Sequence, residues 1–307
     1  MGMMNRRDVL RLGVPLASAA KELSASACQS ALEERTVAEY NSYVKTAREA
    51  IEQAISGKLS RVPEEHRAAA TRKLESDRWF VWNLQDSKPN GALRVYKGVV
   101  VDWMGALLLP GVSLEKFEGV LQNYAAYKRV YQPYIYDCYA TQIPGPGYKN
   151  FRVTSILHDV LEKPAPLVPD QHFSFEVVAD SNYFQIGEEK RTLVIRTHAN
   201  QIREADGGRP EFADGRKENR LLPAGRGQGV LWKSDTWWRA TQIGSALYAE
   251  YESVSLARGL DAVEFFSLCS VLKLPGVKGK ALESMVTRPR KTVTSVMLST
   301  KKALESD

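Results

Sequence analysis

Aromatic and charged side chains alternate along residues 231–258, and these residue types could bind a ligand or carry acid–base chemistry. One tight turn divides the stretch into two predicted strands. Because alternate residues of a strand point to opposite faces, Trp232 and Trp238 share the less charged face, and we expect both to face a core or cavity. Trp237 falls on the other face and should cover the outside of the sheet, under the N-terminal helices.

Two carboxylates, Glu250 and Glu252, fall on one face of the second predicted strand. One interpretation is that both are exposed to solvent and pair across strands with Lys233 or Arg239, as most strand charges do. The other is that one of them lies in a cavity, where burial would raise its pKa and let it bind a ligand hydroxyl or act as a general acid–base. We favour the exposed interpretation, because charged side chains are rarely fully buried.

Cysteine and histidine spacing indicates neither a disulfide framework nor a metal site. Cys28, Cys138 and Cys269 are odd in number and far apart, and no two histidines occur at i,i+4 around a glutamate. No glycine-rich loop opens a helix in the way that phosphate binding requires, and no G-x-S-x-G elbow occurs. We therefore expect no metal and no cofactor, and we assign no catalytic residue.

The composition is that of a packed globular protein. The chain has 307 residues, of which 44% are hydrophobic, and its net charge of +6 is too small for a dedicated nucleic-acid binder. No run approaches the ~18 apolar residues that a membrane-spanning helix needs. We expect a monomer with no nucleic-acid partner.

Residues 1–29 are predicted to be an export signal. Arg6-Arg7 precedes a short apolar segment that ends in small residues, which is typical of twin-arginine signals. This predicts export to the periplasm or cell envelope. The alternative is a basic helix that is never removed, on a cytoplasmic protein.

The remaining chain reads as a helical N-terminal region, residues 30–90, followed by one larger unit. Two amphipathic helices are expected, at 30–57 and 63–74. Ser113 is a good N-cap for the first helix of the larger unit, and Pro289 should kink or break the last one. The expected elements of that unit are a strand at 98–110, a helix at 114–130, strands at 135–142, 148–157, 173–187 and 192–204, a loop at 204–229, the two strands of 231–258, a short helix at 260–272 and a long helix at 276–306. This order predicts an α+β fold.

Three stretches carry a resemblance to a known family: "VVVDWMGALLLPGVSLEKFEGVLQNYAAYKRVYQP", "GVLWKSDTWWRA", and "LYAEYESVSLARGL" ahead of a long terminal helix. Residues 97–304 resemble the START-like, or SRPBCC, superfamily, whose helix-grip fold wraps a curved antiparallel sheet around a long C-terminal helix. The N-terminal helical extension resembles that of uncharacterised exported bacterial members.

The resemblance implies a deep apolar cavity between sheet and helix that holds a lipid, sterol, polyketide or similar hydrophobic molecule. Several aromatic residues and one carboxylate are expected to bind it: Trp103, Phe151, Phe175, Trp232, Trp238, Tyr248, Tyr251 and Glu250.

Three functions follow as hypotheses. The first is a non-catalytic carrier or sensor for a hydrophobic small molecule, with few polar groups in its pocket and transient contact with a membrane surface through basic residues of the last helix. The second is a cyclase- or hydratase-like enzyme, which needs two titratable groups converging in the pocket. Its candidate acid–base groups are Glu250, Glu252, Tyr248 and His198. The third is a protein-interaction module whose core is filled by side chains.

Overall fold

The computed structural model describes residues 30–53, 59, 61–88, 91–161, 171–187, 191–205, 221–227, 229–258 and 277–306. The expected export signal, most of the expected loop at 204–229 and the expected short helix at 260–272 lie outside these ranges.

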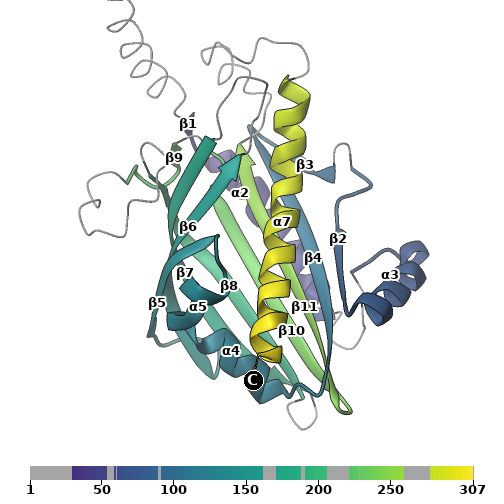
Figure 1. Ribbon diagram of the computed structural model, residues 1–307. Helices are drawn as coiled ribbons and strands as arrows, with labels where there is room; N and C mark the ends of the chain where they lie inside the picture. Colours follow the sequence, from purple (N-terminus) through teal and green to yellow (C-terminus); the bar gives the residue numbers. More distant parts are fainter. Residues whose placement is uncertain are drawn as a thin grey trace, which may run out of the picture.

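One antiparallel sheet dominates the fold (Figure 1). In the described ranges it has nine strands, of which eight follow the order β2-β4-β11-β10-β8-β7-β6-β5 and the ninth, β3, also pairs with β4. A separate short ladder joins β1 (Ser30–Ala31) to β9 (Arg226–Gly227). The strands of the large sheet are β2 (Trp79–Asn83), β3 (Leu93–Val95), β4 (Gly98–Pro110), β5 (Ile135–Gln142), β6 (Lys149–Leu161), β7 (Gln171–Ile186), β8 (Thr192–Glu204), β10 (Lys233–Ile243) and β11 (Ala246–Arg258).

The strands expected from alternating hydrophobicity are confirmed. The bounds of β4, β5 and β8 agree with the prediction to the residue. Proline and glycine set the ends of two of them, since Pro110-Gly111 stops β4 and Gly244, at φ +58°, forms the turn between β10 and β11.

Four short strands, β1, β2, β3 and β9, were not expected. Strand β2 follows the second helix with a single residue between them, Arg78, whose φ of +66° turns the chain out of the helix. Strand β2 then pairs with β4 along Trp79–Asn83, and β3 pairs with the beginning of β4. The N-terminal region therefore contributes to the sheet as well as covering it.

The helices are α2 (Glu34–Gln53), α3 (Glu64–Asp77), α4 (Leu114–Gln122), α5 (Tyr127–Val130) and α7 (Val277–Glu305). The expected helix at 114–130 begins as predicted, with the Ser113 hydroxyl accepting a hydrogen bond from the Lys116 amide at 3.2 Å. It ends at Gln122, however, because Asn123 leaves the helical region at φ −81°, ψ 64°, and a 3-10 turn precedes α5. Helix α7 is continuous through Pro289, so no break occurs there. None of the helices in the described ranges is long and apolar enough to cross a membrane.

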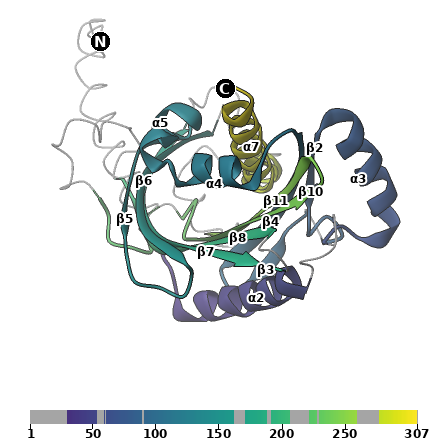
Figure 2. The same ribbon diagram turned by 90° about the horizontal axis from the view of Figure 1, so that it is seen from below.

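The sheet separates two layers of helices. Figure 2 shows α4, α5 and α7 on its concave side and α2 on its convex side, and we call these the inner and outer faces. Trp238 and Tyr251 belong to the inner hydrophobic cluster with Met297 of α7, whereas Trp237 packs with Tyr40 of α2 in the outer cluster. A curved antiparallel sheet thus grips the long C-terminal helix, which is the expected α+β helix-grip fold.

The terminal helix lies very close to β4 at one point. A side chain at Gly105 would place its Cβ 1.7 Å from the sulfur of Met297, which is fully buried. Glycine at this position lets helix and sheet approach each other. The helix is therefore held against β4, and the space beneath it lies toward the other strands.

Candidate functional site

A cavity of about 320 Å³ lies between the inner face of the sheet and helix α7. Strands β6, β7, β8, β10 and β11 supply one wall, and α4, α5 and α7 supply the other. The cavity contradicts the hypothesis of a core filled by side chains. Its volume is at the lower end of the range for small-molecule sites, about 300–1,000 Å³.

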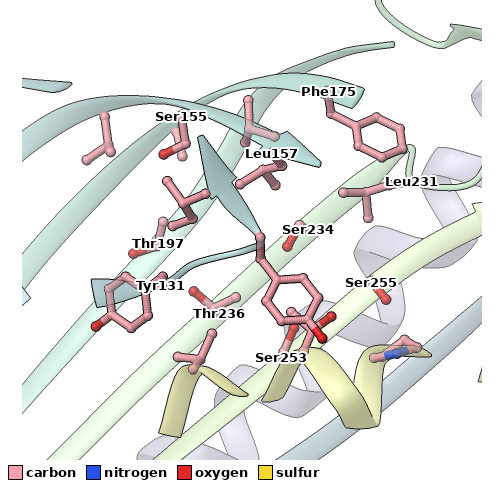
Figure 3. A pocket seen from close by; sticks show the side chains of 18 of the residues that line it. Tyr131, Ser155, Leu157, Phe175, Thr197, Leu231, Ser234, Thr236, Ser253 and Ser255 are labelled. Carbon is pink, nitrogen blue, oxygen red and sulfur yellow. The ribbon is translucent and has the colours of Figure 1, made fainter. Parts of the chain in front are cut away.

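Hydroxyl groups line the sheet side of this cavity (Figure 3). The register places Ser253 of β11 opposite Thr236 of β10, Thr236 opposite Thr197 of β8, and Thr197 opposite Ser181 of β7. All four line the cavity. Four neighbouring strands therefore present one hydroxyl each, in a row that runs across the sheet. We call these four residues the hydroxyl row. The expectation of few polar groups in the pocket is wrong.

Tyrosines of β7 and of the helical wall also line the cavity, and several of their hydroxyls already have partners. Tyr183 of β7 donates to the backbone carbonyl of Leu121 at 3.1 Å, and its hydroxyl lies 2.8 Å from that of Tyr124 in the helical wall. Tyr131 lies 3.0 Å from the Thr300 hydroxyl of α7. Burial raises the pKa of Tyr124 to about 12, so this phenol stays neutral at physiological pH.

His158 and Arg288 also line the cavity. Nδ1 of His158 lies 3.0 Å from the Ser174 hydroxyl, and its Nε2 lies 3.2 Å from Nδ1 of His172. The Arg288 guanidinium lies 5.1 Å from the centroid of the Phe173 ring. Across the part of the chain that the structure describes, no group of three or more His, Cys, Asp and Glu side chains could hold a metal ion.

Three of the eight expected site residues line the cavity: Phe175, Trp238 and Tyr251. The Trp238 and Tyr251 rings are 4.7 Å apart between centroids and form one corner of it. Trp103 lies in the inner hydrophobic cluster, and Phe151 packs 5.4 Å from the Tyr124 ring, so both are on the inner side without lining the cavity.

Trp232 is buried in a core, as one of the two expected alternatives, but it does not line the cavity beside Trp238. It packs in the outer cluster with Trp237 and Val254. The alternation rule fails because Trp232 precedes the strand, which begins at Lys233. The expectation for Trp237 itself, beneath the N-terminal helix, is confirmed.

Glu250 and Tyr248 lie on the outer face, so neither reaches the cavity. Glu250 is 7% exposed and pairs with Arg239 and with the Tyr248 hydroxyl. The Leu59 amide donates to both Glu250 and Tyr248 at 2.8 Å. The predicted pairing with Arg239 is confirmed, but the solvent exposure is wrong, because the segment around Leu59 covers these side chains.

Glu252 is also buried, at 5% exposed, next to the fully buried Asp102. Arg61 lies 3.0 Å from Glu252 and 3.7 Å from Asp102, and Tyr43 donates a hydrogen bond to Asp102 at 2.7 Å. Desolvation and the neighbouring Glu252 carboxylate raise the pKa of Asp102 well above its ordinary range. We call Arg61, Asp102, Arg239, Glu250 and Glu252 the outer charged cluster.

His198, the remaining acid–base candidate, is on the outer face as well. Its Nδ1 lies 2.7 Å from Asp235, which also accepts a hydrogen bond from Tyr40 at 2.8 Å. The hydrogen bond to Asp235 raises the pKa of His198. All four groups proposed for catalysis therefore lie on the opposite side of the sheet from the cavity.

Sequence reasoning missed the hydroxyl row and the tyrosines of the helical wall. A signal was present, because Ser234, Thr236, Ser253 and Ser255 occupy every second position on the face of each strand that also carries Trp238 or Tyr251. A two-residue spacing of hydroxyls on an otherwise apolar face indicates a polar surface that a packed core would not require.

Comparisons with known proteins find similarity of structure but none of sequence. No family model and no curated protein matches the sequence. Among solved structures, the chain is similar to a STAR-related lipid transfer protein from Xanthomonas axonopodis, with 11% identity over 68% of this chain and 99% of that one and a TM-score of 0.32. It is similar to a START superfamily protein from Mycobacterium smegmatis, with 12% identity over 67% and 97% and a TM-score of 0.35. It is also similar to the Zhui aromatase/cyclase from a Streptomyces species, with 12% identity over 67% and 94% and a TM-score of 0.35.

The fold itself is shown by the strand order of the sheet and by the long terminal helix that the sheet grips.

Proposed function

We propose that this protein binds a hydrophobic small molecule or lipid in the cavity beneath α7 and carries or senses it without changing it. The single observation that supports the proposal is the cavity itself, which is lined by apolar and hydroxyl-bearing side chains of the sheet and the terminal helix. Protein interiors are close-packed, and an internal space of this size has a cost in lost packing unless a ligand or water occupies it.

The size of the cavity favours a small molecule, because about 320 Å³ is at the lower end of the range for small-molecule sites, about 300–1,000 Å³.

Catalysis by the four acid–base candidates of the sequence receives no support. Glu250, Glu252, Tyr248 and His198 lie on the outer face, where hydrogen bonds and ion pairs hold them, and the sheet separates them from the cavity. An enzyme with this structure would have to use other groups that line the cavity, such as His158 and Tyr131.

The test is native mass spectrometry of the purified protein, followed by extraction and identification of any bound molecule. The variant Ser255→Phe fills the cavity from β11, and Ser42→Phe makes the same change at an exposed position of α2. We expect a co-purifying ligand on the wild type and on Ser42→Phe, and its loss from Ser255→Phe with circular dichroism unchanged. Retention of the ligand by Ser255→Phe, or a wild type that binds nothing from lipid and metabolite extracts, contradicts the proposal.

We also propose that the protein acts after export, as a monomer, with transient contact between the basic residues of its terminal helix and an anionic membrane surface. The support is the Arg6-Arg7 pattern at the N-terminus and the basic run of the last helix. Cell fractionation of the wild type and of an Arg6→Lys, Arg7→Lys variant tests the export. We expect the wild type in the envelope fraction and the variant in the cytoplasm, and equal distributions would contradict it.

A further inference from the structure

The hydroxyl row extends across about three strand spacings. Neighbouring strands lie about 4.8 Å apart, so Ser253, Thr236, Thr197 and Ser181 together span roughly 14 Å along the inner face. Trp103 of β4 pairs with Ser253 at one end, and Phe151 of β6 pairs with Ser181 at the other. A polar line of limited length therefore ends at an aromatic residue on each side.

A second, shorter line lies parallel to the first. Ser234 of β10 is directly opposite Ser255 of β11, two residues further along each strand, and both line the cavity (Figure 3). Two residues of a strand advance about 6.7 Å. The six hydroxyls therefore form a grid in which neighbours are roughly 5 Å apart across the strands and roughly 7 Å apart along them. A grid with two dimensions suits a flat molecule better than a single chain.

These hydroxyls open into the cavity. Thr197, Thr236 and Ser253 are half-buried, whereas the strand neighbours of Thr236 and Ser253, which point to the outer face, are buried. Burying a hydroxyl without a hydrogen-bond partner is unfavourable, by about 1–3 kcal/mol in mutational data. The row is thus placed where water or a ligand can satisfy it.

Hydrogen bonds within the row leave capacity for a ligand. The hydroxyls of Ser181 and Thr197 are 2.8 Å apart, and Tyr251 forms hydrogen bonds with Thr236 and Ser253. Each hydroxyl has one proton to donate and two lone pairs, so one bond between two hydroxyls leaves one donor and three acceptor sites. The row can therefore donate to and accept from a bound molecule.

The groups of the row are neutral. Burial raises the pKa of Tyr251 to about 12, so it remains a phenol at physiological pH, and the four row residues carry no charge. The facing wall includes the apolar Leu121 of α4 and Val296 of α7, beside the polar Tyr131 and Arg288. A matching molecule has uncharged oxygens on the edge that meets the row and hydrocarbon where it meets Leu121 and Val296.

We infer that the ligand is a compact, flat molecule with two or more uncharged oxygens along one edge, which lie on the hydroxyl row while its apolar face packs against the helical wall. This inference rests on the proposed function and makes it more specific. It predicts that hydrocarbon chains, which have no oxygens along their length, bind more weakly than oxygenated rings of similar size.

Calorimetric titration of the full chain with matched probes tests the inference. The probes are naphthalene, 1,3-dihydroxynaphthalene and dodecanoate, which separate ring shape, ring oxygens and a single chain. Thr236→Val and Thr197→Val each remove one hydroxyl of the row at nearly constant shape. Thr292→Val makes the same change on α7, where the hydroxyl donates to its own helix at 3.3 Å, and serves as the matched control.

We expect the dihydroxy probe to bind at least tenfold more tightly than naphthalene. Each row variant should lose about two- to tenfold in affinity for it, the effect of one net hydrogen bond, with no change for naphthalene. Thr292→Val should leave both affinities unchanged, and Thr236→Ser, which keeps the hydroxyl, should bind as the wild type does.

Two results overturn the inference, and they differ in meaning. Equal binding of naphthalene and the dihydroxy probe, or tighter binding of dodecanoate with no effect of the row variants, leaves the carrier function standing and rejects the oxygenated ligand. Binding of no probe, together with no co-purifying molecule, rejects both.

Discussion

The two faces of the sheet carry different kinds of polar side chain, and β11 supplies both. Its outward residues Glu250 and Glu252 are charged, buried and paired with arginines, whereas its inward residues Ser253 and Ser255 are neutral and open to the cavity. A buried charge must keep its partner, because an unpaired one is far more costly than an unpaired hydroxyl. The charged groups of the outer face therefore hold the N-terminal region in place, whereas the hydroxyls of the inner face remain able to bind a ligand.

The largest change in the free energy of unfolding should follow the replacement of Arg61, on the outer face. In Arg61→Ala, Glu252 and Asp102 stay buried without their guanidinium, and we expect the free energy of unfolding to fall by about 3 kcal/mol. Urea unfolding measures it. Arg48→Ala, which breaks an exposed pair with Glu52, is the matched control and should cost less than about 0.5 kcal/mol. Equal effects of the two variants would remove the distinction between buried and exposed pairs on this face.

A smaller effect should appear in the pH dependence of stability. The folded state raises the pKa of Asp102, so it binds that proton more tightly than the unfolded chain does. The free energy of unfolding should then fall as pH rises from about 4 toward the folded pKa, by up to about 1.4 kcal/mol per pH unit. Asp102→Asn has no proton to lose and should flatten this part of the profile. Urea unfolding between pH 4 and 9 measures it.

The control for Asp102 is Asp86→Asn, at an exposed position that should keep the wild-type slope. If the free energy of unfolding depended on pH in the same way for the wild type and Asp102→Asn, the pKa of Asp102 would be equal in the folded and unfolded states, and the prediction would be wrong.

The smallest effect on stability should come from the inner face. Thr236→Val, which we expect to weaken ligand binding, removes a hydroxyl that opens into the cavity, so the free energy of unfolding should change by less than about 1 kcal/mol. The same urea assay without ligand measures it. A loss as large as that of Arg61→Ala would mean that the hydroxyl row supports the fold instead of serving recognition.

The order of strands and their faces could be predicted because residue alternation is local. The face of Trp237 and Trp238 follows from their positions in β10 alone. What covers a face is a long-range property, so the burial of Glu250 beneath Leu59, 191 positions away in sequence, could not be predicted. The cavity was expected only from a family resemblance, and its hydroxyls were missed because serine and threonine are ordinary on exposed strands too.

The pairing of β4 with β11 also has a consequence for how the chain is made. Gly98 pairs with Arg258, 160 positions later in the sequence, so β4 can meet this partner only after most of the polypeptide has been made. Helix α2 is synthesised early, yet its buried residue Tyr40 packs against Val254 and Trp237. Until those residues emerge, part of the apolar side of α2 lacks its native cover, and such exposed surface favours aggregation. We therefore expect the nascent chain to be most prone to aggregation between the synthesis of α2 and that of β11.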